Sequence, residues 1–154
     1  MKAGRFVEGN LGYLLGQANY ALYKGFDAQV RAAGLSFIEW RVLAALHERT
    51  PLTVSRLARE VLSKQPTVTK LVQRMAEQGW VELQADPADQ RCSMVLASQS
   101  GQQLVKPLVD AARAHEERIL QTLSATERDA LKTLLNKLAV AAESSRPAPT
   151  SSPA

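Results

Sequence analysis

The sequence is poor in the residue types that build metal sites, redox centres and active sites. It contains one cysteine, Cys92, and two histidines, His47 and His115, which stand far apart and have no acids or thiols clustered around them. One cysteine excludes an intrachain disulfide and a thiolate metal cluster, and we expect neither a metal nor another cofactor. We find no Ser/His/Asp arrangement and no glycine-rich phosphate loop, so the sequence does not predict an enzyme.

Long hydrophobic runs are also absent. No apolar stretch approaches the roughly 18 residues that a membrane-spanning helix needs, so we expect no membrane-embedded segment. The N-terminus carries Lys2, Arg5 and Glu8 and lacks the apolar core of a signal peptide. Together with the single cysteine, these features favour a location in the reducing cytoplasm.

The chain does have the composition of an ordinary globular domain with a mild basic excess. Of its 154 residues, 45% are apolar and 22% are charged, which suits one domain, or one domain with an attached helical element. The net charge of +4 favours an anionic partner, nucleic acid foremost, although many ordinary proteins share this bias.

Helical spacing and capping signals organise the first third of the chain. Apolar residues recur at helical spacing from Phe6 to Ala33, and Gly34 follows as a C-terminal stop. Ser36 and Glu39 form a capping box at the start of a second helix, and Thr53 caps a third.

The remaining helices follow the same rules. A fourth helix begins after a break at residues 63–65 and ends at Gly79. A fifth runs from about 100 to 122, and a sixth is capped by Ser124 with Glu127 three residues on.

A short hairpin interrupts this helical order. The segments WVELQA and CSMVLA read as two strands, and the turn DPADQR at 86–91 lies between them. Two helices a few residues apart, followed at once by a hairpin, form the pattern of a winged helix–turn–helix. We therefore predict a mostly α-helical protein with a small β hairpin (α+β).

The fourth helix has the face of a DNA-reading helix. On a helical wheel its apolar residues form one buried stripe, and hydrogen-bond formers and cations cover the rest. Amides and hydroxyls read base edges in the major groove, while cations meet phosphates. The residues predicted to contact DNA are Ser63, Lys64, Gln65, Pro66, Thr67, Thr69, Lys70, Gln73 and Arg74.

Charge is concentrated in the same region. Between Thr53 and Gly79, five cationic residues stand against two acidic ones, a surplus of three that makes up most of the chain's +4. The alternative interpretation is a solvated amphipathic helix pair, as found in many helical proteins, but the hairpin directly after Gly79 favours the winged helix.

The lone arginine of the hairpin turn is the predicted wing contact. Arg91 can reach a narrow minor groove, where the negative potential is concentrated. Asp89 can hold and aim its guanidinium by a charge-assisted pair. Alternatively, Asp86 and Asp89 simply make the turn, and Arg91 neutralises them on the surface.

With these residues in place, the chain resembles the MarR (multiple antibiotic resistance regulator) family of dimeric winged-helix transcription regulators. The segments LSKQPTVTKLVQRMAEQGWVEL and DPADQRCSMVLASQSG are similar to the family's recognition helix and wing signature, and FIEWRVLAAL is similar to its second helix. The wing signature joined to the TVTKLV helix is the specific part of the match. Where the family's wing tips often carry basic residues, this chain has Ala88 and Gln90, which implies fewer phosphate contacts there.

The resemblance implies a division of the chain and a homodimer. It assigns residues 1–34 and 100–143 to dimerisation and 35–99 to a DNA-binding winged helix–turn–helix. The outer helices also carry apolar stripes too long for so small a winged domain to cover, which independently favours pairing. The Pro/Ser-rich tail at 144–154 is expected to be disordered.

Relatives in this family bind small aromatic acids between the dimerisation and DNA-binding parts. Tyr13, Tyr20, Trp40 and Arg41 could line such a cleft here, since an arginine and aromatic rings suit these anions. The same aromatic residues are equally good core packing. Cys92 is interpreted as an ordinary strand residue, because the first helix, where relatives carry reactive cysteines, has none.

These features lead to one main hypothesis and two competitors. The main one is a transcriptional regulator, a repressor in most of this family, that binds a near-palindromic operator in double-stranded DNA and is released by a small effector. The second keeps the fold as a protein-interaction module without specific DNA binding. The third, an enzyme, has no catalytic cluster to support it.

Overall fold

The computed structural model describes residues 6–48 and 51–145 of the chain. The chain divides into two compact units, Met1–His115 and Glu116–Ala154, and each is treated by itself here. The prediction of a disordered tail at 144–154 lies almost wholly outside the described residues. Its first residue, Ser144, is helical. Among the described residues, no helix is both long and apolar enough to span a membrane.

The N-terminal helical segment is divided in two, where the sequence predicted one helix from Phe6 to Ala33. α1 (Phe6–Gly9) is followed by α2 (Leu11–Ala32), and Asn10 lies between them. Asn10 has extended backbone angles, and its side chain accepts a hydrogen bond from the Tyr13 N–H at 3.0 Å. The cap satisfies an N–H that would otherwise lack a partner, so Asn10 starts a new helix although the apolar spacing continues through it.

The predicted helix starts after α2 are confirmed in detail. Before α3 (Phe37–Glu48), the Glu39 carboxylate accepts from the Ser36 N–H at 2.8 Å, and the Ser36 hydroxyl accepts from the Glu39 N–H at 3.4 Å. Thr53 caps α4 (Val54–Glu60) by accepting from the Arg56 N–H at 3.2 Å. These caps set where each helix begins.

The turn between α4 and α5 (Gln65–Glu77) contains a strained residue. Leu62 has a φ of 54°, in the left-handed region that favours glycine, and its side chain is 81% exposed. Two backbone hydrogen bonds close the turn, from the Leu62 N–H to Arg59 O at 3.2 Å and from the Ser63 N–H to Ala58 O at 2.9 Å. α5 then ends at Gly79, whose φ of +77° confirms it as a helix stop.

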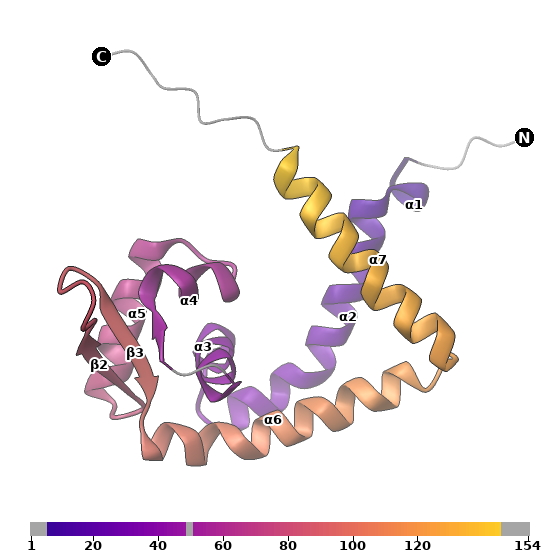
Figure 1. Cartoon of the computed structure of the whole chain (residues 1–154). Coiled ribbons are helices and arrows are strands. Elements are labelled where there is room, and N and C mark those ends of the chain that lie inside the picture. Colours follow the sequence, from indigo (N-terminus) through magenta and orange to yellow (C-terminus); the bar gives the residue numbers. More distant parts are fainter. Residues whose placement is uncertain (1–5, 49–50, 146–154) are drawn as a thin grey trace, which may run out of the picture. The chain divides into compact units, whose positions relative to one another are not determined.

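The sheet has three strands, one more than the predicted hairpin. β2 (Val81–Ala85) and β3 (Ser93–Ala97) form the expected antiparallel pair, with Leu83 opposite Val95. A two-residue strand, β1 (Leu52–Thr53), pairs with the other edge of β3, giving the order β1-β3-β2. β1 is too short to show alternation in the sequence, and it ties the start of α4 to the wing (Figure 1).

The first turn of α6 (Gln99–Leu120) is joined closely to the end of α5. The Gly79 carbonyl accepts hydrogen bonds from the hydroxyls of Ser98 and Ser100 at 2.5 and 2.6 Å. The Ser98 N–H donates to Trp80 O at 3.0 Å. A Cβ on the buried Gly101 would overlap the Trp80 carbonyl oxygen, so only glycine permits this approach. We call these residues the α5–α6 junction.

The core of the first unit joins all of its layers. Fully buried side chains come from α2, α3, α4, α5, β3 and α6, and they form one cluster. Both histidines fasten α6 to neighbouring helices: His47 Nδ1 lies 2.7 Å from Gln102 Oε1, and His115 Nε2 lies 3.1 Å from Leu22 O.

In the second unit, α7 (Ala125–Ser144) begins at the predicted capping box of Ser124 and Glu127. Arg128 reaches back to Glu117 Oε1 at 2.8 Å and to the Leu123 carbonyl at 3.1 Å. No residue of α7 is buried within the described chain. Its leucines therefore stay exposed in a single copy.

Candidate nucleic-acid interface

The helix α5 has the two faces that the sequence predicted. Its buried residues are Val68, Leu71, Val72 and Met75. Of the residues proposed to contact DNA, all are exposed apart from Ser63 and Thr69, which are half-buried. Most of the proposed reading residues are therefore accessible to a partner.

Within that surface, Thr69 is already engaged. Its hydroxyl donates to the Gln65 carbonyl at 2.9 Å, one helical turn earlier. The donor is occupied, so Thr69 offers a partner its oxygen lone pairs and its methyl group. No side chain caps the start of α5, because Lys64 stands at the N-cap position without a capping hydrogen bond.

Arg74 has a partner inside the protein. Its Nη2 lies 3.7 Å from Glu39 Oε1, while the Arg74 side chain stays 61% exposed and that of Glu39 only 9%. The other oxygen of Glu39 accepts from the N–H and hydroxyl of Ser36 at 2.8 and 2.7 Å. Arg74 therefore connects the outer face of α5 to the capping box of α3.

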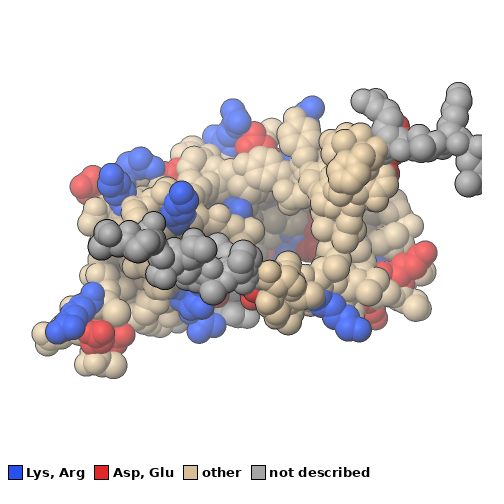
Figure 2. All heavy atoms as spheres, turned by 90° about the horizontal axis from the view of Figure 1, so that it is seen from above, with Lys and Arg blue, Asp and Glu red and all other residues tan. Residues whose placement is uncertain are grey.

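On one face of the molecule, positive and negative side chains are mixed. On the face shown in Figure 2, Lys and Arg side chains are interspersed with Asp and Glu. The cationic surplus of residues 53–79 thus acts as scattered charges beside acids, such as Arg56 with Glu60 at 3.5 Å. Such an arrangement suits several separate phosphate contacts.

The wing turn is built differently from the prediction. Asp89 accepts from the backbone N–H of Arg91 at 3.0 Å, and Asp86 accepts from the N–H of Ala88 at 2.9 Å. Among the described residues, the Arg91 guanidinium forms no ion pair within 4.0 Å, so the expected pair with Asp89 is wrong. Aspartates commonly bond backbone N–H groups two residues on, and here that local turn has taken up the carboxylate.

Cys92 completes the turn. Its N–H donates to Asp89 O at 2.9 Å, and its Sγ lies 3.7 Å from Asp89 Oδ2. The negative charge of Asp89, followed by burial, raises the pKa of the exposed Cys92 thiol. A raised pKa keeps the sulfur as a thiol, which supports its interpretation as an ordinary residue without a redox role. Cys92 does not begin the strand as predicted, because its N–H closes the turn onto Asp89 O and β3 starts at Ser93.

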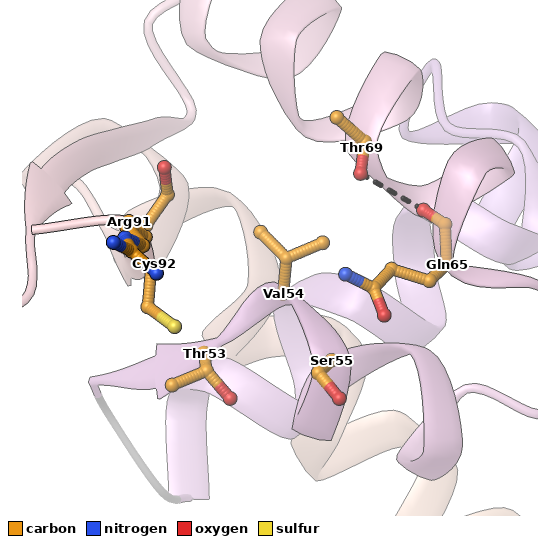
Figure 3. Close-up of a pocket in the computed structure, with 8 residues that line it drawn as sticks. Thr53, Val54, Ser55, Gln65, Thr69, Arg91 and Cys92 are labelled. Carbon is orange, nitrogen blue, oxygen red and sulfur yellow. Dashed lines mark hydrogen bonds between the residues drawn. The ribbon is translucent and has the colours of Figure 1, made fainter. Parts of the chain in front are cut away.

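A pocket of about 260 Å³ opens between α4, α5 and the wing. It is lined by Thr53–Ser55, by Gln65 and Thr69, and by Arg91, Cys92 and Ser93, the first residue of β3. In Figure 3, the side chains of Cys92 and Gln65 point toward it from opposite sides, with Val54 between them. The sequence did not single out Ser55 or Ser93. A hydroxyl in the first turn of a helix and another at a strand start were the available signals.

The four residues proposed for an effector cleft differ in surroundings. Trp40 is 8% exposed and packs on Phe26, with ring centroids 5.3 Å apart. Arg41 is half-buried, whereas Tyr13 and Tyr20 lie on the outer face of α2 and are 45% and 61% exposed. None of these four residues lines the pocket between α4, α5 and the wing.

Two further ring contacts were not identified from the sequence. The rings of Tyr23 and Phe37 have centroids 3.5 Å apart, and Phe26 also faces His115 at 6.2 Å. Burial and the charge of Asp27 raise the pKa of Tyr23, so its hydroxyl stays protonated. Within 6–48 and 51–145, no group of three His, Cys, Asp or Glu side chains is placed to hold a metal ion.

Comparison with known proteins identifies this architecture. Residues 33–91 match the sequence model of the MarR family. The transcriptional repressor NicR of Pseudomonas putida is 30% identical over 132 residues, which span 86% of this chain and 84% of NicR. The chain belongs to the MarR family.

Structural similarity agrees with this assignment. The crystal structure of the MarR family regulator SPO1453 from Silicibacter pomeroyi superposes with a TM-score of 0.77 at 36% identity, covering 87% of this chain and 98% of that one. The activator BadR of Rhodopseudomonas palustris is 30% identical over 116 residues, which span 73% of this chain and 66% of BadR. As a MarR-family member, the chain is a winged-helix transcriptional regulator and not an enzyme.

Proposed function

We propose that this MarR-family regulator binds a near-palindromic operator in double-stranded DNA as a homodimer and represses transcription. One observation carries the proposal: α5 buries only an apolar stripe and presents amides, hydroxyls and cations outward, immediately before the wing. A helix of this kind fits the major groove, where those groups read bases and meet phosphates.

The proposal assigns different tasks to neighbouring residues. Gln73 reads a base edge, Lys70 neutralises a phosphate, and Arg91 reaches the minor groove from the wing. Lys70→Ala should weaken binding to all sequences alike and lower the salt slope by about one unit. Gln73→Ala should relax discrimination between sequences by roughly 1–3 kcal/mol. An unchanged affinity in Arg91→Ala would rule out the wing contact.

Exposed leucines support the homodimer. On α2, Leu11, Leu14 and Leu22 are 51%, 49% and 43% exposed, and α7 carries Leu134 at 56% and three further leucines near 40%. Apolar surface of this extent on two helices is typical of an interface. We therefore assign residues 1–34 and 100–143 to dimerisation and 35–99 to DNA. Sedimentation equilibrium should give twice the chain mass.

The proposal also covers the direction of regulation and the release of DNA by an effector. The 30% identity to the repressor NicR supports repression of transcription. The similarity to the activator BadR makes activation the alternative. We propose a small aromatic or anionic effector whose cleft includes Trp40 and Arg41, with Tyr13 and Tyr20 nearer its rim. Aromatic carboxylates added to the protein–DNA complex should then release the DNA.

The deciding experiment is fluorescence anisotropy of the full chain on labelled DNA from upstream of its own gene, at two salt concentrations. A scrambled duplex of the same composition is the control. Tight binding to the native DNA alone, weakened by salt, is the expected result. Equal weak binding to both duplexes would call for a genome-wide selection of sites. Absence of binding at both salts would favour the protein-interaction module.

A further inference from the structure

The pocket between α4, α5 and the wing is lined by side chains from all three of these elements. The start of α4 supplies Ser55, α5 supplies Gln65 and Thr69, and the wing supplies Arg91 and Ser93 (Figure 3). Its volume of about 260 Å³ exceeds that of a single tetrahedral anion, so there is room for a phosphodiester with part of its sugar.

Hydrogen-bond donors in this pocket are uncommitted. Among the described residues, no hydrogen bond or ion pair occupies the side chains of Ser55, Ser93 or Arg91, and all three are exposed. Thr69, by contrast, already donates to Gln65 O. The pocket therefore offers two free hydroxyls, one amide and one guanidinium, which together complement the oxygens of an anion.

The residues that line the pocket carry no acidic side chain. The nearest wing carboxylate, Asp89, bonds the Arg91 N–H and the Cys92 Sγ. Because the pKa of Cys92 is raised, its sulfur adds no negative charge either. An anion in the pocket thus meets donors and a cation, and the Asp89 carboxylate that contacts the lining is already engaged in hydrogen bonds within the turn.

We propose that this pocket seats one phosphodiester of the DNA backbone, held by the Ser55 and Ser93 hydroxyls and the Gln65 amide, beside Arg91, which keeps the minor-groove role proposed above. The proposal rests on the DNA-binding function above and assigns Gln65 to the backbone and not to a base. A phosphate bound there contacts α4, α5 and the wing at once. It therefore fixes the position of α5 along the major groove without reading the base sequence.

The test places a carboxylate in the pocket without harming the fold. Ser55 is the second residue of α4, where an acid is favourable, so Ser55→Asp should fold normally. The affinity of Ser55→Asp for the native and for the scrambled duplex should fall by the same factor, at least about tenfold. The dependence of log affinity on log salt concentration should become shallower by about one unit. Ser55→Asn, which introduces the neutral isostere of aspartate, should bind DNA at most about threefold more weakly than the wild type. Gln99→Glu, an exposed change of equal charge at the start of α6, should bind like the wild type.

The single cysteine provides an independent readout. Cys92 lines the pocket and is exposed, so N-ethylmaleimide labels one known place in the chain. Saturating duplex should slow its labelling at least about fivefold, while millimolar inorganic phosphate should not, since the seat is built for a phosphate within a polymer. Equal protection by free phosphate would overturn the proposal in favour of a small-anion site.

The outcomes separate the pocket from the function. If the wild type binds its operator and Ser55→Asp binds as tightly, the proposed phosphodiester site is wrong. The same holds if Ser55→Asp loses affinity for the native duplex alone. In both cases the proposed regulatory function is unaffected. If the wild type binds no duplex, the DNA-binding function fails and the seat fails with it.

Discussion

The ion pair between Arg74 and Glu39 allows a quantitative test of how α5 is held against α3. The perturbation is a double-mutant cycle of Arg74→Ala, Glu39→Gln and the pair of changes together. Glu39→Gln keeps an oxygen that can accept from the Ser36 N–H and hydroxyl, so the capping box survives while the charge is removed.

The expected magnitude follows from the geometry. Two unit charges 3.7 Å apart interact by about 1 kcal/mol in water and by roughly 4 to 5 kcal/mol at an effective dielectric constant of 20. The carboxylate is nearly buried, but the guanidinium is 61% exposed, which brings the pair close to the aqueous value. We expect a coupling free energy of about 1 kcal/mol.

Urea unfolding of the four proteins without DNA, at one protein concentration and low salt, measures the coupling. In 1 M NaCl it should shrink by more than half, because the exposed partner is screened. Arg74→Lys keeps a charge and should retain part of the coupling with Glu39. A coupling below about 0.3 kcal/mol at low salt would refute the reasoning and leave Arg74 free to serve DNA alone.

Three further changes test other parts of the fold. Leu62→Gly should raise the free energy of unfolding by about 1 kcal/mol, because glycine relieves the left-handed backbone and the lost side chain is exposed; urea unfolding that shows a loss would contradict the strain. Gly101→Ala should lower that free energy by at least about 2 kcal/mol through the overlap with Trp80, whereas Gln103→Ala, exposed on the same helix, should stay within about 0.5 kcal/mol. The N–H and hydroxyl of Ser124 lower the pKa of Glu127, so its stabilisation is full above the unfolded value of about 4.3 and is lost as the pH falls through the folded pKa. Unfolding midpoints at pH 7 and pH 3 should therefore differ more in the wild type than in Glu127→Gln.

Most of the fold could be predicted because its signals are local. The capping boxes at Ser36 and Ser124 mark helix starts. Their hydrogen bonds join residues three positions apart, so the spacing in the sequence predicts them. The break at Asn10 was missed because apolar spacing continues through it, and one cap outweighed that pattern. β1 was missed because Thr53 both caps α4 and pairs with Met94, and a two-residue strand depends wholly on its partner.

The site was predictable only where one element carries it. The outer face of α5 followed from helical geometry alone. The pairing of Asp89 with the Arg91 guanidinium did not form, because the backbone N–H two residues on competes for the same carboxylate. Ser55 and Ser93 lie far apart in the sequence, and only the folded chain brings them to one pocket.

The α5–α6 junction has a mechanical consequence. Gly79, just after α5, accepts hydrogen bonds from Ser98, just before α6, and from Ser100 in its first turn, and Gly101 leaves no gap to the backbone of Trp80. Because these segments are in direct contact, the first turns of α6, the end of α5 and the base of the wing must rotate together as a rigid body. A small rotation of α6 at its root would therefore sweep the wing tip through a larger arc, because displacement grows with distance from the pivot.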